Sequence, residues 1–451
     1  MLDGINEKCA VAGIHGNEEA AKLVYLALHA LQHRGQEAAG ISAADGKTIR
    51  TIKDRGLVLN VFDEKNLETL KGSSAIGHTH YSTSGSDSII EAQPVFARYD
   101  LGEMAIVQNG SLTNAKEVRD NLIKIGSIFQ TFMDTENLIH LIAKSKKHRL
   151  LSRIKDALDK TEGAYALIFL SRSKMFAARD RYGLKPLSLG KLKNGGYIVA
   201  SESCAFDLVG AKFIRDVAPG ELLIFEGTKE PKSIQLFEPN PKHCVFEYVY
   251  FARPDSFTFG QNVYTTRKNM GKELARIAPI DADMVVPVPD SGVAAAIGYA
   301  EASGIPFEMA IIRNHYIGRT FIEPTQAMRD LKVKMKLSPM SEFIKGKKLV
   351  VIDDSIVRGT TSKRIVRMLK EAGAAEVHMR ISSPPTTDPC YYGVDTPSKK
   401  NLIAANMTND EICKFIEADS LAFLDADSLL RSVNSTGDNY CTACFTGKYI
   451  I

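Results

Sequence analysis

The stretch that decides the fold runs from residue 349 to residue 362 and reads Leu349-Val-Val-Ile-Asp353-Asp354-Ser355-Ile-Val-Arg358-Gly359-Thr360-Thr361-Ser362. Its four leading apolar residues predict a buried parallel strand, and a helix is expected to follow from Ser362. In an open α/β sheet, ligands bind beyond the carboxyl ends of the strands, where helix N-termini and backbone N–H groups attract phosphate. Asp353 and Asp354 would there accept sugar hydroxyls or hold a hydrated Mg²⁺. The alternative is an ordinary strand–turn–helix with two solvated aspartates.

The glycine spacing of this stretch excludes two common nucleotide-binding motifs. It does not match the dinucleotide fingerprint, and no Gly-Lys-Ser/Thr ends the loop, which argues against a Walker-type NTPase. The spacing instead resembles the signature of type I phosphoribosyltransferases, which bind a ribose 5-phosphate carrying a 1-pyrophosphate. That resemblance implies that the 5-phosphate is held by Ser355, Arg358, Gly359, Thr360 and Thr361, with Asp353 and Asp354 facing the ribose hydroxyls and Mg²⁺.

A second segment of the same half resembles the pyrophosphate loop of that family. It reads Val286-Pro-Val-Pro-Asp290-Ser291-Gly292. The resemblance implies that Asp290, Ser291 and Gly292 line the pyrophosphate side of the substrate, with Ser291 near the metal. Mg²⁺ suits such a site because it prefers oxygen ligands and bridges substrate phosphates.

Length, composition and charge place the chain among soluble globular proteins. With 451 residues, two domains, or three, are expected. A hydrophobic fraction of 44% and a charged fraction of 24% are ordinary, and a net charge of +4 gives no nucleic-acid footprint. No apolar run approaches membrane-spanning length, and residues 1–8 lack the apolar segment of a secretory signal. We therefore expect a cytoplasmic protein with no membrane or nucleic-acid partner.

The pattern of elements changes near residue 237. Before it, helices are predicted over Glu18–His33, Asp134–Lys144 and Arg149–Lys160, mixed with short strands that are expected to be antiparallel. The charged stretch Glu226–Lys242, with three prolines, is interpreted as a linker or a surface crossing. After it, strands alternate with helices, which predicts a parallel α/β sheet. The strands expected there are Met284–Val288, Phe307–Ile312, Lys348–Ile352 and Val377–Ser382.

Motifs of the first half resemble the N-terminal-nucleophile glutamine amidotransferases in order and spacing. They are Cys9-Ala-Val-Ala-Gly-Ile, Gln32-His-Arg34-Gly-Gln-Glu, Gly77-His-Thr-His80-Tyr-Ser-Thr, Gln108-Asn109-Gly110 and Asp134-Thr-Glu. In that family the first residue of the mature chain is the catalytic cysteine, and its own α-amine acts as the base. Taken alone, Cys9 would be a buried cysteine at the start of a strand, and Asn109-Gly110 would be a turn.

The resemblance implies a role for each matching residue. Cys9 attacks the side-chain amide of glutamine, and Asn109 with the backbone N–H of Gly110 forms the oxyanion hole. Asp134 holds the α-ammonium of glutamine, and Arg34 and His80 belong to the glutamine-binding residues. Cys9 has a free α-amine only if residues 1–8 are removed as a leader.

His80 departs from the family pattern Gly-His-x-Arg-Tyr. The family arginine grips the α-carboxylate of glutamine with a permanent, two-pronged charge, whereas a histidine is mostly neutral at pH 7. The expected loss is about 1.5–3 kcal/mol if no other group compensates. Gln108 and Ser111 also depart from the usual His-Asn-Gly-Asn. We therefore expect a weakened affinity for glutamine.

Taken together, the two halves resemble the amidophosphoribosyltransferases, from Cys9 to about Lys448. The resemblance implies an α/β chain whose residues 9–237 form an α+β N-terminal-nucleophile domain with four αββα layers. Residues 238–451 are expected to form a parallel α/β type I phosphoribosyltransferase domain. The implied reaction makes 5-phosphoribosylamine, glutamate and pyrophosphate from phosphoribosyl pyrophosphate, glutamine and water, the first step of de novo purine synthesis.

Four of the seven cysteines have the pattern of metal ligands. Cys441 and Cys444 have ligand spacing, and Cys244 and Cys390 lie far away in sequence. Four thiolates suit structural Zn²⁺ or an iron–sulfur cluster equally well. The resemblance to the cluster-bearing members implies a [4Fe–4S] cluster on these four residues, beside one Mg²⁺.

The resemblance also implies purine nucleotides as feedback inhibitors and a homotetramer. Residues Tyr316–Lys336 are interpreted either as a lid that orders on substrate binding or as an ordinary solvated loop. Two further hypotheses come from His80: an ammonia-dependent enzyme with a weakened glutaminase, and a non-catalytic regulator that binds phosphoribosyl pyrophosphate. A hexosamine-forming amidotransferase conflicts with the loop at residues 353–362.

Overall fold

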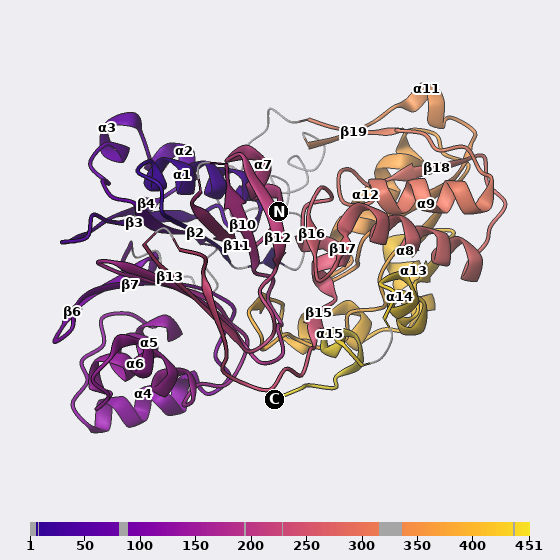
Figure 1. Cartoon of the computed structure of the whole chain (residues 1–451). Helices are drawn as coiled ribbons and strands as arrows, with labels where there is room; N and C mark the ends of the chain where they lie inside the picture. The colour runs from indigo at the N-terminus through magenta and orange to yellow at the C-terminus, as the bar shows by residue number, and fades with distance from the viewer. Residues whose placement is uncertain are drawn as a thin grey trace.

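The structure is a computed structural model that describes residues 6–7, 9–80, 89–193, 195–227, 229–314, 336–435 and 438–451. Most of the predicted leader, motif residues 81–83 and all but the last residue of the Tyr316–Lys336 segment lie outside these ranges. Figure 1 shows two large parts, one in indigo to magenta with two stacked sheets and one in orange to yellow with a helix-covered sheet. No described helix is long and apolar enough to cross a membrane.

The first half contains two antiparallel sheets. The seven-stranded sheet has the order β12-β10-β11-β2-β5-β3-β4, with bounds β2 Cys9–His15, β3 Ala38–Ala44, β4 Ile49–Arg55, β5 Ser74–His80, β10 Ser188–Leu192, β11 Tyr197–Ala200 and β12 Ala211–Asp216. The six-stranded sheet has the order β14-β13-β9-β8-β7-β6, with bounds β6 Val95–Tyr99, β7 Gly102–Asn109, β8 Ala166–Ser171, β9 Lys174–Arg179, β13 Glu221–Glu226 and β14 Lys232–Gln235. The antiparallel prediction for this half is confirmed.

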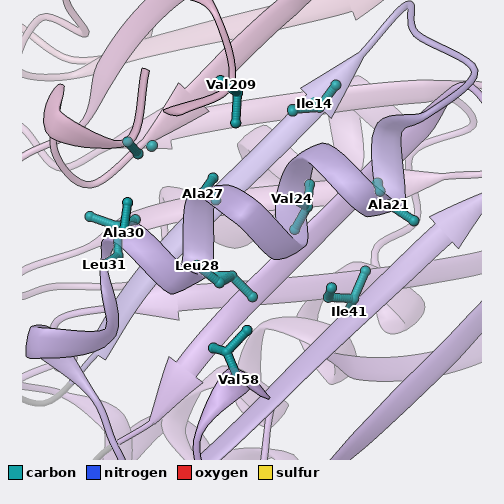
Figure 2. Packing of buried hydrophobic residues seen from close by; sticks show 14 of the residues in the cluster. Ile14, Ala21, Val24, Ala27, Leu28, Ala30, Leu31, Ile41, Val58 and Val209 are labelled. Atoms are coloured by element: carbon teal, nitrogen blue, oxygen red, sulfur yellow. The ribbon is translucent and has the colours of Figure 1, made fainter. Parts of the chain in front are cut away.

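Three apolar layers hold these sheets together. Helix α1 (Ala20–Ala30) packs its buried face on the seven-stranded sheet, where Val24 and Leu28 lie close to Ile14 and Ile41 (Figure 2). A second cluster fills the space between the two sheets. A third lies between the six-stranded sheet and the helices α4 (Ala115–Lys124), α5 (Asp134–Lys144) and α6 (Leu150–Leu158). The result is the expected four-layer αββα arrangement, visible on the left of Figure 1.

Most predicted elements of this half are found within a few residues, but the linker interpretation was wrong in part. Helix α5 has the predicted bounds, and the predicted helix Glu18–His33 is shorter as α1, followed by one 3-10 turn at Gln32–Arg34. Strand β14 lies inside the stretch interpreted as a linker, paired antiparallel with β13. It is a short, mostly exposed edge strand, so it lacks the apolar pattern from which strands are predicted.

The second half is built on a parallel four-stranded sheet of order β18-β21-β22-β24. The strands are β18 (Met284–Pro287), β21 (Lys348–Asp353), β22 (Glu376–Ile381) and β24 (Ser420–Phe423). The principal helices are α8 (Val263–Ile277), α9 (Val293–Ser303), α12 (Thr360–Glu371), α13 (Asn409–Ile416) and α14 (Ala426–Ser432). The predicted parallel α/β sheet is confirmed.

Helices cover both faces of this sheet because its strands are apolar on both faces. Along β21, Val350 and Ile352 pack in one cluster with α8 and α9, whereas Leu349 and Val351 pack in another with α12 and α13. The strand is therefore buried throughout its apolar run, and its carboxyl end presents Asp353.

The predicted strand Phe307–Ile312 was wrong in most of its length. Phe307 makes only an isolated bridge to Val285, and the strand β19 covers Ile311–Arg313, paired with β20 (Leu337–Pro339) outside the main sheet. Within this stretch only Ala310 and Ile311 are buried in the α12–α13 cluster, whereas Met309 and Ile312 are exposed.

Candidate active site

Cys9 is buried at the start of β2, the central strand of the seven-stranded sheet. It pairs in register with His80 at the end of β5, and its Sγ lies 3.7 Å from His80 Nδ1. Paired residues of neighbouring strands point to the same face. Cys9 and His80, which the sequence interpretation put in one site, are therefore brought together by strand register.

Arg34 contacts the backbone of Cys9 and two buried carboxylates. Its Nε donates to the Cys9 carbonyl at 3.4 Å, and its guanidinium forms ion pairs with Glu202 at 2.6 Å and with Glu247 at 2.6 Å. All three charged side chains are fully buried. These contacts place Arg34 next to the Cys9 backbone, and its predicted role in glutamine binding stays a prediction.

The Glu202 carboxylate remains charged in this setting. Burial alone would raise its pKa, but His33 and Arg34 hold the pKa of Glu202 well below its usual range. Glu202 also accepts from the Ser256 hydroxyl at 2.6 Å and from the Arg253 backbone N–H at 2.8 Å. Residues of the second half thus complete the support of Cys9.

The predicted oxyanion residues end strand β7. Asn109 is fully buried, and neither atom of its side-chain amide has a hydrogen-bond partner among the described residues. A buried amide without a partner is costly, so this one is available to a ligand. Gly110 has a φ of +113°, and a Cβ there would lie 2.3 Å from the Ala164 carbonyl oxygen, so the position accepts only glycine.

Asp134 is the first residue of helix α5 and faces the same loop. Its carboxylate accepts from the Leu112 backbone N–H at 2.7 Å and from the Gln108 amide at 3.2 Å. The helix N-terminus adds a favourable dipole for the negative charge. Gln108, which replaces the family histidine, is itself held by the Thr135 hydroxyl at 3.0 Å.

The phosphate loop has the form predicted from its sequence. Strand β21 ends at Asp353, and α12 begins at Thr360 after Gly359, whose φ is +76°. A Cβ on Gly359 would lie 2.7 Å from Ile403, so the tight turn requires glycine. The hydroxyl of Thr361 has no hydrogen-bond partner among the described residues. The start of helix α12 therefore offers the Thr361 hydroxyl to an anion at the end of the strand.

The two aspartates lie buried at this edge. Burial, with the adjacent Asp354 carboxylate, raises the pKa of Asp353 well above its usual range. Asp354 accepts from the Ser355 hydroxyl at 2.6 Å, and the buried guanidinium of Arg267 contributes positive charge nearby. Two adjacent buried carboxylates favour a bound cation, because a cation removes their mutual repulsion.

The pyrophosphate segment adjoins this loop. Val288 donates its backbone N–H to the Ile352 carbonyl at 2.8 Å, and a Cβ on Gly292 would lie 2.3 Å from the same carbonyl. Gly292 precedes helix α9, and the exposed Asp290 pairs with Arg313. The predicted pyrophosphate and ribose segments thus lie side by side at the carboxyl ends of β18 and β21.

The four predicted metal cysteines line one enclosed apolar pocket with Phe246, Tyr392 and Lys185. Cys244 and Cys441 face each other in the parallel pair β15 (His243–Cys244) and β25 (Tyr440–Cys441), and Cys390 and Cys444 complete the pocket. Burial raises the pKa of Cys244 and Cys444 well above the usual range and that of Cys441 to about 12. Such thiols stay protonated unless a metal neutralises them, and their convergence fits a four-thiolate group.

The segment that carries Cys390 and Tyr392 also contacts the predicted oxyanion loop at Gly110. A Cβ on Gly393 would lie 2.7 Å from the Gly110 Cα, and the buried Lys185 donates to the Gly393 carbonyl at 3.1 Å. Glu7 of the predicted leader pairs with Val394 in the small sheet β1–β23 (Asn6–Glu7 with Val394–Asp395). The cysteine pocket, the leader and the glutamine site therefore meet along one stretch of chain.

Sequence reasoning missed Glu202, Glu247 and His78 as parts of the site. Glu202 and Glu247 are buried and lie far in sequence from Arg34, which they contact, whereas His78 stands in the quoted Gly77-His-Thr-His80 motif but was given no role. The only available signal was a charged residue within an otherwise apolar stretch, as at Glu247 between Phe246 and Tyr248.

Comparison with known families agrees with the two halves. Residues 78–207 match a family described as glutamine amidotransferase domain, and residues 263–410 match one described as phosphoribosyl transferase domain.

Similar proteins extend over nearly the whole chain. Amidophosphoribosyltransferase 3, chloroplastic, of Arabidopsis thaliana is 50% identical over 99% of this chain and 84% of its own length. Amidophosphoribosyltransferase of Bacillus subtilis is 48% identical over 99% of this chain and 95% of its own. The solved structure of the B. subtilis glutamine phosphoribosylpyrophosphate amidotransferase, complexed with ADP and GMP, has a TM-score of 0.93 at 48% identity and covers 98% of this chain and 97% of that one.

Proposed function

The chain belongs to the amidophosphoribosyltransferase family, and we propose that it makes 5-phosphoribosylamine from phosphoribosyl pyrophosphate and glutamine, with release of glutamate and pyrophosphate. The observation that carries the proposal is the contact between the halves, where Gly393 packs on Gly110 of the oxyanion loop. A nitrogen-releasing site and a phosphoribosyl site on one chain are useful together only if ammonia passes between them. We assign the first to residues 9–237 and the second to residues 238–451.

In the glutamine half, Cys9 attacks the side-chain amide and the Asn109 amide stabilises the oxyanion. The buried Asn109 amide has no hydrogen-bond partner among the described residues, which supports this role. A donor that is already in place needs no reorganisation as charge develops. Asp134 holds the α-ammonium of glutamine, and His80 lies beside the α-carboxylate of glutamine. Arg34 is a positioning residue that acts through the Cys9 backbone. The leader, residues 1–8, is removed to free the α-amine of Cys9 as the base.

In the phosphoribosyl half, the 5-phosphate binds the loop that leads into α12. Ser355, Arg358, Gly359, Thr360 and Thr361 hold it, and the orphaned Thr361 hydroxyl supports the assignment. Asp353 and Asp354 face the ribose hydroxyls and, with Ser291, hold one Mg²⁺, which offsets pyrophosphate charge when bound. Asp290 and Gly292 line the pyrophosphate side. These residues orient C1 of the ribose towards ammonia and keep water out.

The residues of the cysteine pocket would hold one [4Fe–4S] cluster. Four partly buried thiols from three chain segments fit it, and Lys185 would offset its negative charge. Cys244, Cys390, Cys441 and Cys444 would hold the cluster, which would cross-link their segments, including the one in which Gly393 contacts Gly110. Zn²⁺ on the same four thiols remains the competing hypothesis.

Nucleotide regulation is supported by a solved relative, whereas the assembly is carried over from the family resemblance. The B. subtilis structure is a complex with ADP and GMP, and we infer that purine nucleotides inhibit this chain and that it forms a homotetramer. A cytoplasmic location stays a prediction, since several plant relatives are named as chloroplastic.

Pyrophosphate release, measured with glutamine and with ammonium salt, tests the proposal. The wild type should use both nitrogen sources, Cys9→Ser only ammonium, and the double variant Asp353→Asn/Asp354→Asn neither. Activity of the double variant with ammonium equal to that of the wild type would contradict the phosphoribosyl assignment. A wild type that uses neither source would support the non-catalytic regulator.

His80 favours a second candidate, an ammonia-dependent form with a weakened glutaminase. In that case His80→Arg should lower the KM for glutamine by about 10- to 150-fold, the equivalent of about 1.5–3 kcal/mol. The KM measured with ammonium serves as the internal control and should not change. An unchanged glutamine KM would show that another group already holds the carboxylate.

A further inference from the structure

Three metal-ligating side chains converge at the start of β2. Cys9 Sγ and one ring nitrogen each of His78 and His80 lie within 4.8 Å of one another. They are brought together by the pairing of β2 with β5, in which Cys9 lies opposite His80 and Val11 opposite His78. Since residues two apart on a strand share a face, both histidines point to the side on which Cys9 lies.

His78 is the key residue of this group, because its Nδ1 has no hydrogen-bond partner among the described residues. The ring is fully buried, and its Nε2 lies 3.1 Å from the Gln108 backbone carbonyl. A carbonyl only accepts, so Nε2 bears the proton and Nδ1 is a bare acceptor. Nδ1 has no hydrogen-bond partner among the described residues. A buried acceptor without a donor is costly, and it calls for a ligand.

The ring also has the hydrogen-bond support of a metal ligand. Metal-binding histidines commonly donate their other N–H to a backbone carbonyl, which fixes the tautomer and the ring orientation. The Gln108 carbonyl provides that support here.

The distances and donor types fit Zn²⁺. With Zn–S near 2.3 Å and Zn–N near 2.0–2.1 Å, a tetrahedral site places sulfur and nitrogen about 3.5 Å apart. The observed separation of Cys9 Sγ and His80 Nδ1 is 3.7 Å. One thiolate and two imidazoles leave a fourth position for water, which is the pattern of open zinc sites. His80, which replaces the family arginine, supplies the third ligand.

We propose that Cys9, His78 and His80 form a binding site for one Zn²⁺ ion, separate from the four-cysteine pocket, and that zinc there blocks the nucleophile. On binding, Zn²⁺ replaces the thiol proton of Cys9, which passes to solvent. Glutamine hydrolysis stops while the phosphoribosyl half still accepts ammonia. The blocking effect rests on the proposed function, whereas the metal site itself does not. No ligand atom belongs to the backbone, so the site does not depend on removal of the leader.

Crystals of the holoenzyme soaked in zinc, with anomalous scattering recorded at the zinc edge, locate the ion directly. We expect a peak between Cys9 and the two histidines. In titrations against a chromophoric chelator, His80→Arg should lower the affinity by at least about 100-fold, since loss of even an outer-shell partner costs about 10- to 100-fold. His29→Gln, which alters an exposed histidine on α1, is the matched control and should bind zinc as the wild type does.

Enzyme assays then separate the two claims. Zinc should inhibit turnover with glutamine but not with ammonium, and His80→Arg should resist it. A zinc peak confined to the four-cysteine pocket, or equal affinities of wild type and His80→Arg, would overturn the metal site and leave the proposed function intact. A zinc-free wild type that cannot hydrolyse glutamine would instead overturn the proposed function while the peak remained.

Discussion

Gly393 of the second half packs directly on Gly110 of the first, so closely that a Cβ on Gly393 would lie 2.7 Å from the Gly110 Cα and 3.0 Å from the Ser111 nitrogen. The proposed oxyanion loop at Asn109–Gly110 is therefore in contact with the segment that bears Cys390. Any change that displaces this segment is expected to lower the rate of glutamine hydrolysis more than the rate of the phosphoribosyl reaction.

The first prediction concerns this contact. Gly393→Ala should lower glutamine-dependent turnover by at least about tenfold, the equivalent of about 1.4 kcal/mol in the barrier, because the new methyl group displaces the oxyanion loop. Ammonium-dependent turnover should stay within about twofold. Gly304→Ala is the control, since Gly304 also has a positive φ of +75° but no neighbour within 4 Å of an added Cβ. Equal losses with both nitrogen sources would contradict a local effect.

The second prediction concerns the buried ion pairs beneath Cys9. Arg34→Ala should lower the free energy of unfolding by about 3–5 kcal/mol, because it removes the buried cation that pairs with the carboxylates of Glu202 and Glu247. Urea denaturation measures the change. Arg367→Ala breaks the exposed pair with Glu417 and should cost no more than about 1 kcal/mol.

A double-mutant cycle tests whether the cost comes from the pair itself. Glu247→Ala should lower the free energy of unfolding much less in the Arg34→Ala background than in the wild type. The reason is that the guanidinium which Glu247 pairs with has already been removed. Additive losses would show that Arg34 and Glu247 act independently.

The third prediction concerns pH. The folded-state pKa of Asp353 is raised by burial beside Asp354, so the folded chain binds more protons there than the unfolded chain. Stability without substrate should therefore fall as the pH rises from the unfolded pKa through the raised folded pKa. Asp353→Asn, which is neutral at every pH, should raise the thermal midpoint at pH 7 and give no gain below the unfolded pKa of about 3.9. At the same time it should abolish Mg²⁺-dependent binding of phosphoribosyl pyrophosphate.

The exposed Asp281 provides the control for the substitution. Asp281→Asn removes an exposed carboxylate and should leave the thermal midpoint at pH 7 unchanged. A thermal midpoint of Asp353→Asn that is below that of the wild type at pH 7 would show that the ionised Asp353 stabilises the fold.

The fourth prediction concerns the cysteine pocket. Protein purified without oxygen should be brown and contain about four irons per chain, and Cys444→Ser should lose both. Cys413→Ser is the control, because Cys413 lies outside the pocket on α13. Colourless protein with one zinc per chain would favour the zinc hypothesis for the four cysteines.

Much of the fold was predictable because it depends on local patterns. Four apolar residues before Asp353 and a glycine before Thr360 suffice to predict a buried strand, a turn and a helix. Strand β14 was not predictable, since an exposed edge strand can be polar on both faces. The Phe307–Ile312 prediction failed because an apolar run shows burial but not whether its backbone joins a sheet.

The site was predictable only where residues act through matched motifs. Cys9, Asn109 and Asp134 each stand in such a motif. The buried charges of Glu202 and Glu247 were not predictable, because their partner Arg34 lies more than 160 residues away and only the packing of the two halves joins them. The unpartnered Nδ1 of His78 is equally invisible without the strand register that buries it.

Transfer of nitrogen from glutamine labelled with ¹⁵N in its amide, in the presence of excess unlabelled ammonium, tests the central claim most directly. If Cys9 releases ammonia that travels inside the protein, trapped phosphoribosylamine should contain more ¹⁵N than free exchange with the ammonium pool allows, and Cys9→Ser should give none. Product labelled only to the level of the pool, or labelling by Cys9→Ser equal to that of the wild type, would contradict the account.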